Sequence, residues 1–186
     1  MHADDTDLDA LAAQVRAVPA LDLEEVGHLL PGAAAAGPAR ERLVQDQLRV
    51  ALDEVLTRRD RGVDVVDLFQ EASVAAIVAV SEYADRGGPP EGLHRYVGRV
   101  IGVHLEAAIE EAEIERRSDE AFVRDAQSYE DAELNLRHEL GRSATNTEIA
   151  ALLAWPEERV AVVAEAVTAA RQIWDSELVQ YLDDTD

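Results

Sequence analysis

The chain has 186 residues, which is enough for one substantial core or two small helical domains. Its formal net charge is −22, and all 17 of its basic residues are arginine. Duplex DNA is a dense line of negative charge that proteins bind by displacing its counterions with cations. A chain this acidic is therefore not expected to bind DNA unless it gathers arginines on one face. The simplest explanation of the acidity is solubility. The simplest explanation of the missing lysines is GC-rich codon usage.

Aromatic residues make up only 4% of the chain, whereas Ala, Val and Leu are abundant, and this mixture favours helices over a sheet. No apolar run reaches the roughly 20 residues that a membrane span needs, and the acidic start does not resemble a signal peptide. There is no Cys, which excludes disulfides and thiolate metal sites. We therefore expect a cytoplasmic, all-α protein without a membrane segment.

The first third of the chain combines short helical patterns with turns. Residues 1–7 are expected to be disordered. Apolar residues at intervals of three and four predict a short amphipathic helix over Leu8–Val18, and Asp22 is placed to cap a second one. The run PGAAAAGP at Pro31–Pro38 predicts a turn. A long helix with an apolar stripe follows, and it is expected to end near the arginine cluster Arg58–Gly62.

The middle of the chain carries the longest helical patterns. The first, Asp64–Ala84, is apolar on more than one face and is expected to be central to its domain. The sequence GGPP at Gly87–Pro90 ends it. Two further helices are predicted over Glu91–Arg117 and Asp119–Leu140. The first of these completes a main helical domain that is predicted over residues 8–120, and a linking helix leads into the last part of the chain.

The last part of the chain predicts a separate three-helix domain over residues 121–174. Thr145 and Glu148 have the spacing of a capping box, in which each side chain satisfies an otherwise unpaired amide. Pro156 suits the first turn of the helix that follows. Residues 175–186 are expected to form an acidic tail.

Four segments of the chain form a pattern when they are taken together. They are AVPALDLEEV at 17–26, ARERLVQDQLRVAL at 39–52, RGVDVVDLFQE at 61–71 and LRHELGRSATNTEIAALLAWPEERVAVV at 136–163. In order and spacing they resemble conserved segments of the bacterial sigma-70-like RNA polymerase sigma factors. They cover the family's N-terminal, second and third regions, and no segment resembles its C-terminal promoter-reading region. The resemblance implies an all-α fold in which a sigma-factor-like multi-helix domain is followed by a small three-helix domain.

The third of these segments resembles the family's D-L-I-Q-E helix, which docks on a coiled coil of the largest subunit of core RNA polymerase. The matching residues are Asp67, Leu68, Gln70 and Glu71, and Ser73 follows where the family has Asn. Spacings of three and four residues put Asp67, Gln70 and Glu71 on one helix face. A solvated helix start, where acids favour the helix dipole, would also explain these residues. The resemblance implies that the five residues form a polymerase-binding or other partner-binding site.

The stretch LHRYVGRVIGVHLEA at 93–107 corresponds to the segment with which the family recognises and opens promoter DNA. Aromatic side chains there stack on flipped bases, which contributes about 1–3 kcal/mol per base. Only one aromatic residue is kept, and a carboxylate replaces a base-reading hydroxyl. The degenerate DNA-reading positions are Leu93, Tyr96, Arg99, Val100, Val103 and Glu106. The resemblance therefore implies a degenerate member of the family with little or no direct DNA binding.

The following segment, residues 106–133, has reversed its charge relative to the family. It contains eleven carboxylates and three arginines where the family presents cations to phosphate. A solvated helical face would account for such a run. The alternative is an acidic surface that repels DNA or occupies a basic groove of a protein.

No pattern in the sequence indicates catalysis. The five histidines lack a metal-ligand pairing, and there is no P-loop, dinucleotide-binding glycine motif or nucleophile elbow. The many acids supply no distinct acid–base pair. We expect no enzyme activity, no catalytic residues, no metal and no cofactor.

Three functions are compatible with this sequence. The first is a transcription regulator that binds core RNA polymerase but lacks the residues for promoter recognition and melting. The second is a sigma-factor mimic that binds an anti-sigma factor or another regulator. The third is a divergent working sigma factor. The sequence leaves the oligomeric state open, as well as the possibility that a second chain supplies DNA recognition.

Overall fold

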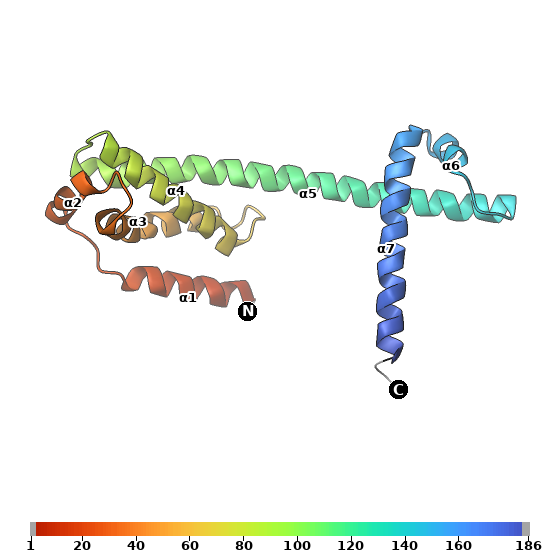
Figure 1. Ribbon diagram of the computed structural model, residues 1–186, viewed down its shortest axis with the longest axis horizontal. Coiled ribbons are helices and arrows are strands. Elements are labelled where there is room, and N and C mark those ends of the chain that lie inside the picture. The colour runs from red at the N-terminus through yellow and green to blue at the C-terminus, as the bar shows by residue number, and fades with distance from the viewer. Residues whose placement is uncertain (1–2, 184–186) are drawn as a thin grey trace. The chain divides into compact units, whose positions relative to one another are not determined.

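The computed structural model describes residues 3–183, with side chains described for residues 10–174. All regular elements in residues 3–183 are helical, which confirms the all-α prediction (Figure 1). The described residues form two compact units, unit 1 up to Glu113 and unit 2 from Ile114 onward. The elements are α1 (Ala3–Ala17), α2 (Leu23–Leu29), η1 (Leu30–Gly32), α3 (Pro38–Leu56), α4 (Val65–Asp85), η2 (Pro90–Gly92), α5 (Leu93–Leu140), α6 (Asn146–Leu153) and α7 (Glu157–Asp183).

Side-chain caps start three of these helices. Asp22 accepts a hydrogen bond from the Glu25 amide at 2.8 Å, and the Glu25 carboxylate accepts one from the Asp22 amide at 2.9 Å. Asp64 accepts hydrogen bonds from the amides of Val66 and Asp67 at the start of α4. Such caps satisfy amides that lack a partner within the helix, so they fix where each helix begins.

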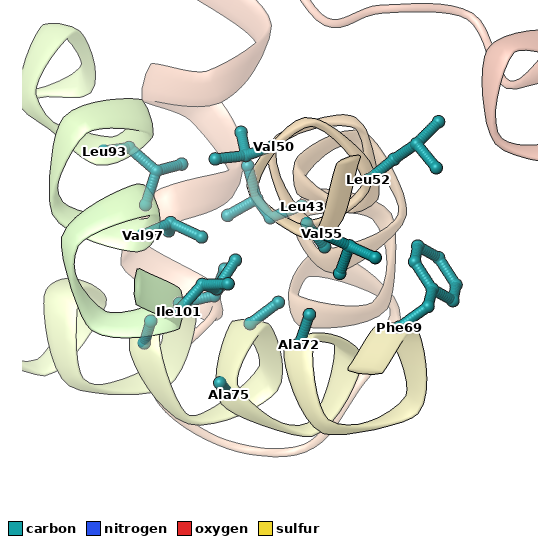
Figure 2. Packing of buried hydrophobic residues seen from close by; sticks show 14 of the residues in the cluster. Leu43, Val50, Leu52, Val55, Phe69, Ala72, Ala75, Leu93, Val97 and Ile101 are labelled. Carbon is teal, nitrogen blue, oxygen red and sulfur yellow. The ribbon is translucent and has the colours of Figure 1, made fainter. Parts of the chain in front are cut away.

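The core of unit 1 lies among α3, α4 and the first part of α5. Figure 2 shows Leu93, Val97 and Ile101 of α5 pointing toward Leu43 and Val50 of α3. Helices α3 and α4 lie side by side in this unit (Figure 1). The side of α4 that faces the core carries several small residues, which allow close helix packing, namely Ala72, Ala75, Ala76 and Ala79. The prediction that this helix is central to its domain is confirmed.

The turn between α4 and α5 is arranged around Tyr83. The Tyr83 hydroxyl donates a hydrogen bond to the Pro89 carbonyl at 2.7 Å. Gly88 and Gly92 leave the space that the Tyr83 ring occupies, because a Cβ atom at either position would collide with it. The predicted stop at GGPP is therefore a packed turn.

Helix α5 is continuous from Leu93 to Leu140, whereas the sequence predicted two helices that meet near Ser118. No glycine or proline lies between Gly102 and Gly141. Instead, Arg116 donates a hydrogen bond to Glu120 at 2.6 Å across the predicted break. Because a serine alone does not interrupt a helix, the prediction of two helices was wrong.

The terminal helices extend further than predicted. Helix α1 begins at Ala3, within the segment predicted to be disordered, and the α7 backbone continues to Asp183 in the predicted tail. Apolar spacing shows which part of a helix packs on a core, and it does not show how far the helix extends beyond that part. Residues 1–2 and 184–186 lie outside the described part of the chain.

Unit 2 combines the end of α5 with α6 and α7. Its core contains Tyr129 of α5, Ile149 of α6, and Val160 and Val163 of α7. The capping box predicted at the start of α6 is present: the Thr145 hydroxyl accepts a hydrogen bond from the Glu148 amide, and the Glu148 carboxylate accepts one from the Thr145 amide. Among the described residues, the helices are all too short or too polar to cross a membrane.

Candidate partner-binding surfaces

Helix α4 presents a polar group followed by an apolar group on its exposed side. Asp67, Gln70 and Glu71 are all exposed. Three large apolar side chains follow within two further turns, with exposed fractions of 59% for Val74, 42% for Ile77 and 41% for Val78. Intervals of three and four residues place the six on one side of the helix. We call these residues the α4 face: Asp67, Gln70, Glu71, Val74, Ile77 and Val78.

Two of the predicted partner-binding residues lie elsewhere. Leu68 is 1% exposed and packs in the core of unit 1, so its role is to hold α4 in place. Ser73 is half-buried, and its hydroxyl donates a hydrogen bond to the Phe69 carbonyl at 2.7 Å. A direct partner contact is therefore wrong for Leu68, because water and partners do not reach it.

The sequence prediction missed the apolar half of the α4 face. The run AAIVAV at Ala75–Val80 is apolar throughout, so its periodicity does not distinguish the buried side chains from the exposed ones. The polar residues upstream carried a usable signal, because steps of three and four residues from Gln70 and Glu71 lead to Val74, Ile77 and Val78.

The predicted DNA-reading positions are distributed between the core and the surface of unit 1. Leu93 is buried and Val100 is half-buried against the core. Arg99 and Val103 are exposed on α5. The six positions therefore do not form one exposed surface.

Tyr96, the aromatic residue that is kept, makes contacts within unit 1. Its hydroxyl donates a hydrogen bond to Glu82 at 2.7 Å, which raises the pKa of Tyr96. Its ring centroid lies 5.2 Å from that of Tyr83, and the Arg86 guanidinium lies 5.4 Å from the Tyr96 ring. A base that stacked on this ring would compete with both neighbours.

Glu106 connects α5 to the end of α3. Its carboxylate accepts a hydrogen bond from Arg58 at 2.9 Å and a longer one from Arg61 at 3.4 Å. Arg58 also donates to the Glu54 carboxylate at 2.7 Å. The hydrogen bond from Arg58, together with the charge of Arg61, lowers the pKa of Glu106. This carboxylate is therefore held in an intramolecular ion pair.

Several acids of the charge-reversed segment have arginine partners within unit 2. Arg159 of α7 pairs with Asp125 at 2.6 Å. Arg171 pairs with Glu130 at 3.1 Å and with Glu133 at 3.0 Å. These pairs neutralise part of the segment, which favours a structural role for these particular acids. Within the described residues no cluster of three His, Asp or Glu side chains converges on a metal position.

The family model described as sigma-70 region 3 matches residues 126–173. The matched segment comprises the end of α5, all of α6 and most of α7, and it includes the 136–163 segment of the resemblance. Sigma-70 region 3 is a domain of transcription factors and not of an enzyme family. The comparison with curated proteins gives no match. The match covers 48 of the 186 residues and supports a sigma-70-like role in transcription. The family is one that associates with RNA polymerase.

Proposed function

We propose that this protein is a non-enzymatic, sigma-factor-like transcription regulator that binds core RNA polymerase through the α4 face. It does not itself recognise or melt a promoter. The observation that carries the proposal is the exposed polar group Asp67, Gln70 and Glu71 on a helix that is otherwise anchored in a core. The region 3 match at residues 126–173 supports the same class of function.

The chemistry of the α4 face suits a helical protein partner. Carboxylates and an amide accept charge-assisted hydrogen bonds from arginines of a partner. The adjacent Val74, Ile77 and Val78 supply apolar area that loses water on contact. Protein interfaces combine such an apolar centre with a polar rim. The partner proposed is the coiled coil of the largest polymerase subunit.

The proposed lack of promoter recognition follows from the first part of α5. Tyr96 is already in contact with Tyr83 and Arg86, and Glu106 is paired with Arg58. Arg99 and Val100 stand where the resemblance implies tryptophans, so stacking platforms for flipped bases are missing there. The net charge of −22 adds long-range repulsion from DNA.

The test is copurification of the full chain with core RNA polymerase. The variant Asp67→Ala plus Gln70→Ala is expected to lower the affinity by at least about tenfold, because both side chains lie on the α4 face. Glu41→Ala plus Gln45→Ala is the matched control, since it removes one exposed acid and one exposed amide from α3. Unchanged polymerase binding by the first variant would show that the proposed site is wrong.

A surface of unit 2 favours the alternative of a sigma-factor mimic that binds an anti-sigma factor or another regulator. A groove of about 380 Å³ between α5 and α7 is lined by Phe122, Val123 and Trp174, with Glu130 and Arg171 also at its wall. Such regulators hold apolar and acidic surface and need no DNA-reading residues. Recovery of a small regulator in place of polymerase subunits in the same copurification would favour this alternative.

The third possibility, a divergent working sigma factor, makes a different prediction. Core polymerase with this chain alone would then transcribe from a promoter in a purified system. The proposed regulator is expected to give no promoter-directed transcript and to show no salt-sensitive binding to promoter DNA by itself.

A further inference from the structure

A line of exposed residues on α5 lies outside both the core of unit 1 and the α4 face. Arg95, Arg99 and Val103 follow one another at intervals of four residues, so they lie on one side of the helix. All three are exposed, and Val103 has an exposed fraction of 67%. We call these three residues the α5 stripe.

The two arginines of the α5 stripe differ from most arginines of this acidic chain. Arg58, Arg159 and Arg171 each bind carboxylates at 3.1 Å or less. Within residues 10–174, the guanidinium groups of Arg95 and Arg99 have neither a hydrogen-bond acceptor nor an ion-pair partner. In the part of the chain whose side chains the structure describes, these two neighbouring cations therefore lack a carboxylate partner, although the sequence has 39 acidic residues.

Both arginines border the same two hollows in the surface of unit 1. One hollow, of about 520 Å³, is lined in addition by Val50 and Gly98. The other, of about 340 Å³, is lined in addition by Tyr83 and Gly92. Gly98 in one hollow and Gly92 in the other have no side chain, which leaves room for an incoming side chain to reach the guanidinium groups.

The charges around the α5 stripe favour a protein carboxylate over a nucleic acid. Asp53 and Glu54 line the larger hollow, and Glu91 lines the smaller one. A duplex gains affinity from many phosphate contacts, and Arg95 and Arg99 beside these acids offer few of them. Arg58 also lines the larger hollow, but it is already paired with Glu54 and Glu106. A short acidic segment needs only two carboxylates, each of which an arginine can bind through two parallel hydrogen bonds.

We propose that the α5 stripe binds an acidic amphipathic helix of a protein partner, through two carboxylates one turn apart and an apolar side chain one turn further. The carboxylates pair with Arg95 and Arg99, and the apolar side chain packs on Val103. The proposal goes beyond polymerase binding, because the α5 stripe and the α4 face share no residue. It also gives the first part of α5 a function other than DNA reading.

The test uses the full-length protein and a designed peptide as the probe. The peptide is a fluorescently labelled Ala/Gln helix with two Glu residues one turn apart and a Leu residue one turn further, and binding is followed by anisotropy. The wild-type protein is expected to bind it, and Arg95→Gln plus Arg99→Gln to weaken binding by at least about tenfold. Val103→Ser is expected to weaken it several-fold through lost apolar contact.

Two controls separate a specific site from general electrostatics. Arg59→Gln plus Arg124→Gln removes the same charge from two exposed positions outside the stripe and is expected to leave binding unchanged. Arg95→Lys plus Arg99→Lys keeps the charge but loses the paired hydrogen bonds. Its affinity for the peptide is therefore expected to lie between that of the wild-type protein and that of Arg95→Gln plus Arg99→Gln. Circular dichroism checks that each variant remains helical.

Three results would overturn the proposal. The first is no peptide binding by the wild-type protein, and the second is equal weakening by the site and control variants, which would indicate net charge alone. The third is tighter binding of duplex DNA than of the peptide, with the loss of that binding in Arg95→Gln plus Arg99→Gln. That result would assign the stripe to nucleic acid.

Discussion

The two units of this protein are stabilised in different ways. Unit 1 surrounds a broad apolar core to which α3, α4 and the first part of α5 all contribute. Unit 2 has a small core around Tyr129, Ile149 and Val160. More of its helix–helix and capping contacts are hydrogen bonds and ion pairs at the surface. There, Arg159 and Arg171 hold carboxylates of α5, and a capping box starts α6. Packing therefore dominates in unit 1, whereas polar contacts matter more in unit 2.

The largest effect is expected from a cavity in the core of unit 1. Ile101 of α5 is fully buried in the core that Figure 2 shows, so Ile101→Ala should lower the free energy of unfolding by about 2–5 kcal/mol. Urea unfolding followed by circular dichroism measures this. Val103→Ala, two residues away and exposed, is the control and should change stability by less than about 0.5 kcal/mol. Equal losses in both variants would contradict a packed core at α5.

The corresponding cavity in unit 2 should lower the free energy of unfolding by a smaller amount. Ile149 is also buried, but its cluster is small and close to solvent, so neighbouring side chains can relax into the space. We expect Ile149→Ala to cost about 2 kcal/mol, at the lower end of the range for such substitutions. Both tryptophans, Trp155 and Trp174, belong to unit 2, so their fluorescence reports its unfolding. A loss larger than that of Ile101→Ala would reverse the comparison of the two cores.

Local signals in the sequence were sufficient to predict the class of fold and several helix starts. Asp22, Thr145 and Glu148 act on amides within three residues, so their capping roles do not depend on the tertiary structure. The continuity of α5 was not predicted, although the residues that most strongly interrupt helices, glycine and proline, are missing between Gly102 and Gly141.

The candidate sites depend on contacts that are distant in the sequence, and here prediction from the sequence was less successful. Leu68 faces the core because α3 covers that side of α4, which no local pattern shows. Tyr96 of α5 donates a hydrogen bond to Glu82 of α4, and its ring contacts Arg86 at the end of that helix. That Arg95 and Arg99 have no ion-pair partner within residues 10–174 is likewise a property of the folded surface.

A smaller effect is expected from the cap of α6. The Thr145 hydroxyl accepts a hydrogen bond from the Glu148 amide, so Thr145→Ala should destabilise unit 2 by about 1 kcal/mol. Thr145→Ser keeps the hydroxyl and is the matched control. Tryptophan fluorescence during urea unfolding measures the change in unit 2. A loss for the Ser variant equal to that for Ala would show that the methyl group, and not the cap, is responsible.

The smallest effect concerns the other partner in the cap, the Glu148 carboxylate. It accepts a hydrogen bond from Arg142 at 2.7 Å and others from the Thr145 amide and hydroxyl at 2.8 and 2.9 Å. These contacts, led by the one from Arg142, lower the pKa of Glu148 from 4.5 to about 2. Because the pKa is lower in the folded state, the carboxylate stabilises unit 2 above about pH 4.5, and this contribution is lost as the pH falls toward about 2.

Glu148→Gln isolates this carboxylate from the other acids of unit 2. The difference in unfolding free energy between the wild-type protein and Glu148→Gln should be constant from neutral pH down to about pH 4.5 and should then shrink toward zero. Its size should stay below that of Thr145→Ala, because solvent and salt screen an exposed ion pair. Tryptophan fluorescence during urea unfolding at successive pH values measures this difference. If the difference grew as the pH fell, Glu148 would be more stabilising when protonated. The ion pair and hydrogen bonds of the ionised carboxylate would then not stabilise unit 2.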